Sequence, residues 1–394
     1  MRWRSALSRQ GSLDACLQES LVAIDLDAQD PPDFVAVFVA PEFDRGLDRL
    51  LENLSASCPE CVFLGCSARG LIGDGEEAEF VAGLSVTAGW LPGVEIREFH
   101  LERETMPDLD SSPDTWRDAL VGQPQGLQGL LLVAEPFSFP GSDFLAGLDY
   151  AYPGVPKAGG LASGGQTPGS SALFHRGKVL RSGVAGVGFY GSVEMKTVVA
   201  QGCRPIGKPM IVTECAYNEI QTLDGQLAGD AVLEVLRSLS KRDQQLAAQM
   251  LFVGLGAGEP KLRYEAGDFL IRQVLGVDPE AHSLVINGRF RKGQTVQLHV
   301  RDHRSSSDDL ETMLENYQRA NSEDEVAGAL LFSCVGRGRA LYGHCHHDSN
   351  LFKAKIGDVP LGGFFGNGEF GPVGGTTSLH GFTSCFALFS EPRG

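Results

Sequence analysis

The chain has 394 residues, of which 50 are acidic and 33 basic, so its formal charge is -17 at pH 7. The length predicts two or three domains. The negative charge repels phosphate backbones and anionic lipid surfaces, which argues against nucleic acid and membranes as partners. No apolar run has the length of a signal peptide or a membrane-spanning helix, and the nine Cys are irregularly spaced, so we expect a cytoplasmic protein with reduced thiols.

The first half of the chain predicts alternating strands and helices. Residues 34–40 form a continuous apolar run, which is typical of a strand buried on both faces. A helix should follow it, with one apolar face made by Phe43, Leu47, Leu50, Leu51 and Leu54. A strand at 61–64 then enters a loop of small residues, and the same pattern returns with a strand at 130–133, a helix over 144–151 and a second small-residue loop.

From residue 173 onward the pattern becomes strand and turn, and Arg176-Gly177 is a candidate hairpin turn. The second half predicts helices at 227–239 and 307–317, and strands at 251–254, 269–275, 295–301 and 329–333. In the strand at 295–301, His299 shares a polar face with Gln297 and Arg301, so we expect it to be solvated. We therefore expect a mixed α/β (α+β) fold of two intimately packed halves, with central mixed sheets flanked by helices and a boundary between 33–224 and 225–394.

Glycine is unusually frequent. It makes up 50 of the 394 residues, nearly twice the average share of about 7%. Residues 65–70, 159–164 and 363–368 each begin and end with Gly and each follow a mostly apolar stretch. If their strands lie side by side, the three loops gather at one end of a sheet, where open α/β proteins usually bind ligands. The alternative is that these glycines only permit tight turns.

Two clusters of metal-binding side chains leave their roles open. His344-Cys345-His346-His347-Asp348 brings five such groups together, but on a strand only alternate residues converge, so we predict no metal site there. Cys58-Pro59-Glu60-Cys61 has the spacing of a redox pair or half a zinc site. It ends a helix instead of beginning one, and no second Cys-x-x-Cys exists, so buried ordinary thiols are the preferred interpretation.

Several longer motifs together resemble those of FIST proteins, with the N-terminal and C-terminal regions in their usual order. They span nearly the whole chain after about residue 30 and comprise residues 65–75, 136–139, 153–165, 332–338, 363–372 and 379–383. The resemblance implies an intracellular sensory module that binds a small ligand, with amino acids the usual suggestion, and no established catalytic activity. No output module accompanies these regions, so we expect signalling through a separate protein partner.

The predicted ligand site combines the glycine loops with polar side chains from both halves. Arginine can hold a carboxylate with two parallel hydrogen bonds, an acid can meet an amine, and hydroxyls and imidazoles add further bonds. The candidates are Cys66, Ser67, Arg69, Ser163, Arg337, Glu369, His380 and Thr383. No catalytic residue is assigned and the cofactor is unknown.

Two other functions remain open. A hydrolase or transferase would use Cys66 or Cys334 as its nucleophile with His380 as base, or Ser67 or Ser163 with a distant His. Some relatives of the family resemble haem-based nitric-oxide sensors, and in a gas sensor of that kind His346, His347 or His380 would be the axial ligand.

Overall fold

The computed structural model describes residues 1–27, 29–257, 261, 263–264 and 267–393. Contacts divide the chain into two compact units. The large unit comprises Met1–Val199, Leu314–Pro372 and Thr377–Gly394, and the small unit comprises Ala200–Met313 and Val373–Thr376. In sequence, the small unit is therefore an insertion in the large one. It runs across residue 224, so the predicted boundary there remains a division of the sequence and not of these compact units.

The large unit contains three repeats of one element order: strand, helix, strand, helix and four strands. The first repeat consists of β1 (Arg2–Ser8), α1 (Leu13–Ala23), β2 (Phe34–Val39), η1 (Pro41–Gly46), α2 (Leu47–Ser57), β3 (Val62–Ser67), β4 (Gly70–Gly73), β5 (Glu76–Glu79) and β6 (Leu84–Trp90). The second consists of β7 (Val94–Leu101), η2 (Arg103–Thr105), α3 (Pro113–Ala119), β8 (Leu127–Ala134), α4 (Ser142–Ala151), β9 (Lys157–Leu161), β10 (Leu173–His175), β11 (Lys178–Leu180) and β12 (Val184–Gly191). The third consists of β13 (Glu194–Ala200), α7 (His303–Ala320), β21 (Val326–Cys334), α8 (Gly338–Tyr342), α9 (His347–Ile356), β22 (Leu361–Gly366), β23 (Glu369–Val373), β24 (Thr376–His380) and β25 (Ser384–Ser390). Residues 303–313 of α7 and 373–376 of the β23–β24 hairpin are counted with the small unit.

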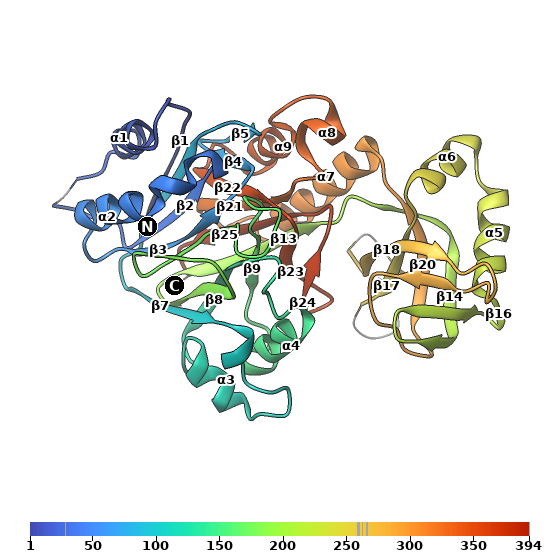
Figure 1. Cartoon of the computed structure of the whole chain (residues 1–394). Coiled ribbons are helices and arrows are strands. Elements are labelled where there is room, and N and C mark those ends of the chain that lie inside the picture. Colours follow the sequence, from blue (N-terminus) through green and yellow to red (C-terminus); the bar gives the residue numbers. More distant parts are fainter. Residues whose placement is uncertain (28, 258–260, 262, 265–266, 394) are drawn as a thin grey trace. The chain divides into compact units, whose positions relative to one another are not determined.

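The repeats form three six-stranded sheets (Figure 1) with equivalent strand orders, β1-β6-β2-β3-β10-β11, β7-β12-β8-β9-β23-β24 and β13-β25-β21-β22-β4-β5. In each sheet the two middle strands run parallel, and the chain connects them through helix α2, α4 or α9. Antiparallel strands flank these pairs. The predicted mixed α/β class, with helices flanking mixed sheets, is confirmed.

The repeats exchange hairpins in a cycle. The hairpin β4–β5, which follows β3 in the chain, adds to β22 of the third sheet. The hairpin β10–β11 adds to β3 of the first sheet, and β23–β24 adds to β9 of the second. Each sheet is therefore completed by a hairpin of another repeat, so backbone pairing joins all three repeats.

One glycine recurs in the second parallel strand of every repeat. A Cβ atom added to Gly65 would lie 1.8 Å from Val37 O, and one added to Gly159 or Gly363 would lie 1.9 Å from the carbonyl oxygen of the strand beside it. Gly159 and Gly363 also have φ values of +154° and +141°, a region that side chains disfavour. These three positions therefore require glycine because of close backbone approach, which explains part of the excess in the composition.

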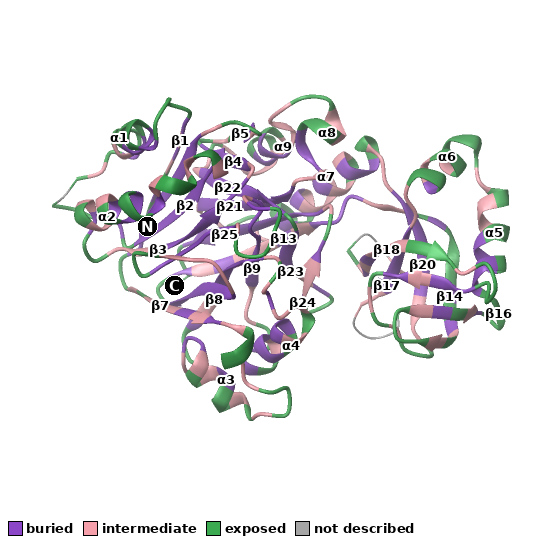
Figure 2. Ribbon diagram, in the orientation of Figure 1, coloured by how far each residue is buried: buried purple, intermediate pink, exposed green. Residues whose placement is uncertain are grey.

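The core of the large unit lies on both faces of its sheets. In β2 the alternate residues Phe34, Ala36 and Phe38 join a central cluster that includes side chains of all three sheets. The opposite face of β2 packs against α1 and α2 in a second cluster. Figure 2 shows the strands as mostly buried and the helices with exposed outer faces. The continuous apolar run of β2 thus has the two-sided burial that the sequence predicts.

The small unit is a closed barrel of six strands covered by two helices, with a short seventh strand outside the closed ring. Its elements are β14 (Arg204–Ala216), β15 (Glu219–Leu223), β16 (Gln226–Leu227), α5 (Ala228–Ser238), α6 (Lys241–Gln249), β17 (Phe252–Gly256), β18 (Phe269–Val277), β19 (Leu284–Ile286) and β20 (Thr295–Val300). The barrel closes because β14 pairs with both β20 and β15, and the seventh strand, β16, pairs with β15 outside the ring. His299 is buried in it, and burial lowers the pKa of its imidazole to about 4, so the expected solvation of this residue is wrong.

Among the residues that the structure describes, no helix combines the length and the apolar character that crossing a membrane requires.

Candidate ligand-binding site

The three glycine segments, which were predicted as loops, begin inside strands: residues 65–67, 159–161 and 363–366 are the ends of β3, β9 and β22. These strand ends and the residues after them, called the glycine loops below, meet in the large unit. Ser163, from the second repeat, donates from Oγ to Phe365 O of the third repeat at 2.5 Å and accepts from Arg69 N of the first at 3.0 Å. Gly164 N donates to Ser67 O at 3.0 Å. One serine hydroxyl thus connects all three repeats at the ends of their parallel strands.

The loops are packed tightly where they meet. Ser67 Oγ accepts from Ala172 N at 2.8 Å, and a Cβ atom on Gly164 would lie 2.3 Å from the same oxygen. A surface pit beside the loops, lined by Arg69, Gly70, Glu79, Phe80, Val335 and Phe365, has no room for a water molecule. The loops therefore converge as the prediction requires, but this pit is closed.

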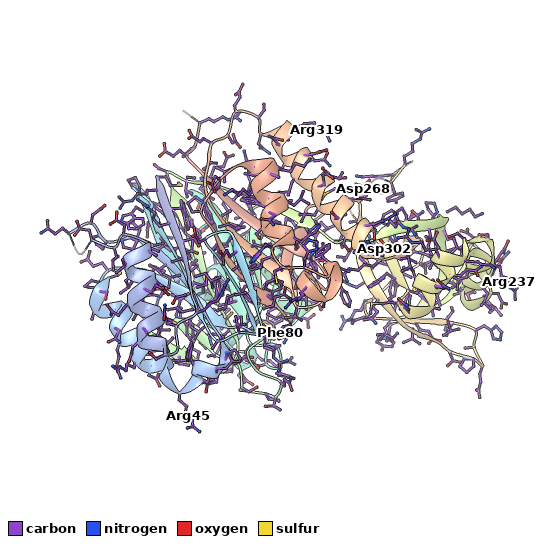
Figure 3. The ribbon with its side chains drawn as sticks, turned by 90° about the horizontal axis from the view of Figure 1, so that it is seen from above. Arg45, Phe80, Arg237, Asp268, Asp302 and Arg319 are labelled. Atoms are coloured by element: carbon purple, nitrogen blue, oxygen red, sulfur yellow. The ribbon has the colours of Figure 1, made fainter. Side chains whose placement is uncertain are left out.

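Arg69 lies at this pit and is half-buried. With the Gln166 amide turned so that its oxygen faces the guanidinium, that oxygen accepts from Arg69 Nη1 at 2.9 Å. Phe80, labelled in Figure 3, lines the same pit and is 64% exposed with φ of +54°. The guanidinium is thus held by a neutral, exposed amide.

Arg337, predicted as a ligand clamp, instead forms an ion pair inside the protein with Asp348. It is fully buried, and its Nε and Nη2 donate to the two carboxylate oxygens of Asp348 at 2.8 and 3.0 Å. Burial alone would raise the pKa of Asp348, but the charge of Arg337 and hydrogen bonds from His347, Arg337 and Ser384 lower it overall. Arg337 Nη2 also donates to Tyr342 Oη at 2.6 Å. This ion pair connects α8, α9 and β25.

Glu369, His380 and Thr383 form a separate buried group near the start of β25. Glu369 Oε2 accepts from Thr383 N at 3.2 Å, and His380 Nε2 lies 2.9 Å from Gly371 O. Thr383 Oγ1 donates to Gly381 O at 3.1 Å. These three contacts stay within the third repeat, whereas the contacts of Ser67, Arg69 and Ser163 cross between repeats.

The cysteine nucleophile has unfavourable surroundings. Cys66 is fully buried in the central core, and burial raises the pKa of its thiol well above the usual value. Little thiolate forms under such conditions, and the thiolate is the nucleophilic form.

The histidine cluster is built from a loop and a helix instead of the expected strand. His347 begins α9, and its ring stacks on Tyr342 with centroids 3.6 Å apart. His346 Nδ1 accepts from Glu77 N at 2.8 Å, and His344 Nδ1 lies 3.0 Å from Tyr342 O. Within the described part of the chain, no three His, Cys, Asp or Glu side chains are placed to hold a metal ion.

A groove of about 410 Å³ lies elsewhere in the large unit. It runs between the edge strand β7, the end of α3 and the exchanged hairpin β10–β11, and it is lined by Glu98, Phe99, His100, Ala119, Leu120, His175, Arg176, Lys178 and Leu180. The hairpin turns at Arg176 and Gly177, with φ values of +49° and +66°, as predicted. Side chains of β7 and the end of α3 thus line one wall, and the hairpin, which belongs to the same repeat, supplies the other.

Two polar atoms in this groove have no hydrogen-bond partner among the described residues. They are Glu98 Oε1 and His175 Nδ1, which lie 3.8 Å apart and are both buried. Burial raises the pKa of Glu98, although the nearby charge of Arg176 opposes this, and Arg176 Nε lies 3.6 Å from Glu98 Oε2. Burial and the charges of Arg176 and His100 lower the pKa of His175 to about 4, so its imidazole is neutral at pH 7.

This groove was not among the sites predicted from the sequence. Glu98 and His100 are two apart on β7 and therefore share one face, which was an available signal. Their partners on the hairpin come from about 75 residues further along the chain, and only the pairing of β10 with β3 places them there.

Comparisons with known proteins give consistent matches along the chain. Residues 33–226 match the FIST N domain and residues 228–372 match the FIST C domain. An uncharacterized protein of Mycobacterium tuberculosis is 36% identical over 351 residues, covering 88% of this chain and 88% of that protein. An uncharacterized protein of Mycobacterium bovis is 39% identical over 261 residues, covering 66% of this chain and 67% of its own.

More distant similarities also exist. An F-box/LRR-repeat protein of Arabidopsis thaliana is 25% identical over 169 residues, covering 41% of this chain and 31% of that protein. Among solved structures, a cyanuric acid hydrolase from A. caulinodans aligns over 100% of this chain and 99% of its own, with 8% identity and a TM-score of 0.37. Since the two domain matches follow one another along the chain and the mycobacterial relative covers most of it, the chain belongs to the FIST family, with a FIST N domain followed by a FIST C domain.

Proposed function

We propose that this protein is a cytoplasmic sensory protein that binds an amino acid, or a similar small molecule with an amine and a carboxylate, in the groove beside β7. FIST domains are sensory domains that are thought to bind small ligands. The nine cysteines are all free, which supports a reducing compartment. In this proposal the occupied state is passed on through a separate protein partner.

The observation that carries the proposal is the pair of unpartnered atoms, Glu98 Oε1 and His175 Nδ1, in a groove of sufficient volume. Buried polar atoms are normally hydrogen-bonded, and an unsatisfied one costs about 1–3 kcal/mol. An ammonium group donates to both a carboxylate and a neutral imidazole nitrogen. In this proposal the two side chains turn slightly toward the groove, and a ligand amine then satisfies both atoms at once.

The remaining lining suits the rest of an amino acid. Arg176 and Lys178 supply positive charge, and an arginine holds a carboxylate through two parallel hydrogen bonds. Phe99, Leu120 and Leu180 supply an apolar wall for a side chain. Because acidic and basic groups lie in one groove, a zwitterion fits it better than a simple anion, which Glu98 would repel.

The test is calorimetric titration with a panel of amino acids, each paired with its N-acetyl derivative and its decarboxylated amine. We expect one class of amino acid to bind and both derivatives to bind at least tenfold more weakly. Glu98→Gln should remove the preference for a free amine, and Arg176→Gln the preference for a free carboxylate.

Arg69→Gln is the matched control, since it tests the alternative binding site at the glycine loops. The affinity of this variant for the amino acid should equal that of the wild type. Binding that is lost in Arg69→Gln and kept in Glu98→Gln would place the binding site at the glycine loops instead. The residues predicted for that site from the sequence are Cys66, Ser67, Arg69, Ser163, Arg337, Glu369, His380 and Thr383. No binding across the panel would contradict the function itself.

A further inference from the structure

The segment Cys58-Pro59-Glu60-Cys61 connects the end of α2 to the start of β3 and is not used by the proposed function. Cys61 N donates to Cys58 O at 3.2 Å, which closes a four-residue β-turn. The first and last Cα atoms of a β-turn lie less than about 7 Å apart, and disulfides join Cα atoms that are about 4.4–6.8 Å apart. The turn therefore brings these two residues within the range that a disulfide needs.

The two side chains also interact. A side-chain interaction with Cys61 lowers the pKa of Cys58. The same interaction, with burial and the nearby Cys58 and Asp33, raises the pKa of Cys61. Cys61 is half-buried, whereas Cys58 is 1% exposed. One sulfur is thus accessible to a reagent, and the other lies beside it and ionises more readily.

We propose that Cys58 and Cys61 form a reversible disulfide, driven by a low-molecular-weight disulfide such as oxidised glutathione. Cys61 is the more exposed of the two thiols. It attacks the glutathione disulfide through its thiolate, which is a minor form because its pKa is raised, so a mixed disulfide forms and one glutathione thiol leaves. Cys58 then attacks Cys61 Sγ, which breaks the mixed disulfide and releases the second glutathione thiol. Two protein S–H bonds are replaced by one S–S bond, and the two electrons and two protons end on two molecules of glutathione.

The surroundings of the turn are compatible with Cys61 as the attacking thiol and Cys58 as the resolving thiol. The turn lies outside the strands, so closing the disulfide breaks no ladder hydrogen bond of β3, which begins at Val62. It does remove the thiol proton that Cys61 directs to Pro32 O at 2.6 Å. From the sequence, Cys58 and Cys61 were interpreted as two equivalent buried thiols. In the structure they differ in exposure and in the direction of their pKa shifts.

The test is peptide mapping by mass spectrometry after equilibration in glutathione buffers, with an acid quench and alkylation of the remaining thiols. We expect the peptide containing Cys58 and Cys61 to lose two hydrogens as the buffer becomes oxidising, and dithiothreitol to restore them. Cys215→Ser, which alters a half-buried cysteine of the small unit, should leave this response unchanged. Cys58→Ser should instead accumulate the glutathione adduct on Cys61, which a pair of inert thiols would not do.

Two outcomes would overturn the proposal. One is alkylation of both cysteines at every buffer ratio. The other is glutathione attached to Cys61 in the wild type without a Cys58–Cys61 bond, since resolution by Cys58 is the step that the turn geometry predicts. Tryptophan fluorescence checks that each variant is folded.

Discussion

Breaking the buried ion pair between Arg337 and Asp348 should severely destabilise the large unit. Asp348→Ala would leave the guanidinium of Arg337, which has no exposed surface, without its carboxylate. The carboxylate also accepts from Ser333 Oγ at 3.2 Å and from Ser384 Oγ at 2.5 Å, so two hydroxyls would lose an acceptor as well.

The size of the effect follows from the burial of the pair. Removing one partner of a buried pair costs about 3–5 kcal/mol because the other charge stays buried and uncompensated. Whole domains are stable by about 5–15 kcal/mol, so this loss is a large part of the total. Asp348→Asn preserves the shape and one acceptor oxygen, and we expect its cost to lie near the lower limit, at about 3 kcal/mol.

Urea denaturation followed by tryptophan emission measures the free energy of unfolding of the large unit alone. The chain has 3 Trp residues, at positions 3, 90 and 116, and all of them belong to that unit. The matched control is Glu76→Gln, which breaks a pair with Arg9 whose side chains are 57% and 45% exposed. Exposed pairs contribute about 0–1 kcal/mol, so the control should shift the transition only slightly. A loss below about 1 kcal/mol in Asp348→Ala would refute the argument, because it would mean that Arg337 reaches water.

Three further predictions concern single residues. Gly159→Ala forces a Cβ atom to within 1.9 Å of Leu132 O, so it should lose about 3 kcal/mol or more in the same urea assay, whereas Gly11→Ala, with open space around it, should change stability little. Burial and the charge of Asp348 raise the pKa of Glu77 to about 7, so the folded protein binds a proton there that the unfolded chain releases above about 4.5, and its stability falls as the pH rises from about 4.5 through 7. Glu77→Gln should therefore be more stable than the wild type at pH 8 and nearly equal at pH 4, and an unchanged difference between the two pH values would contradict this. His175 has the opposite sign, since its lowered pKa of about 4 means that stability falls as the pH decreases from about 6.5 to 4, and His175→Gln should flatten that part of the profile.

Local elements of the fold could be predicted from the sequence because their signals are local. The apolar run of β2, the stripe of α2 and the turn at Arg176-Gly177 each depend on neighbouring residues. The glycine pattern also gave a correct non-local result, since the three loops meet at Ser163. Its physical reason was only partly anticipated, because Gly65, Gly159 and Gly363 are required by close strand contact and not by a ligand.

The exchange of hairpins could not be predicted from the sequence. Nothing in residues 173–180 indicates that β10 pairs with β3 instead of the strand that precedes it. The groove at Glu98 and His175 depends on that pairing, and so it was missed. The prediction for His299 was wrong for a related reason. Alternation of polar and apolar residues predicts a solvated face only when nothing covers that face, and here the ring of Phe269 in β18 packs against the ring of His299, with centroids 5.2 Å apart.

Arg337 illustrates the limit for single side chains. An arginine next to glycines is equally compatible with a ligand clamp and an internal ion pair, and the choice depends on whether an acid lies within reach. Asp348 is eleven residues away in sequence and meets Arg337 only because α9 turns back beside α8.

Hydrogen exchange measured by mass spectrometry, with and without the amino acid that binds most tightly, locates the ligand on the protein. Binding in the groove should slow exchange in residues 94–101 and 173–180, the two segments that form the groove, with little change in residues 65–70, 159–165 and 363–369. Protection confined to those three loops, with residues 94–101 and 173–180 unaffected, would contradict binding in the groove.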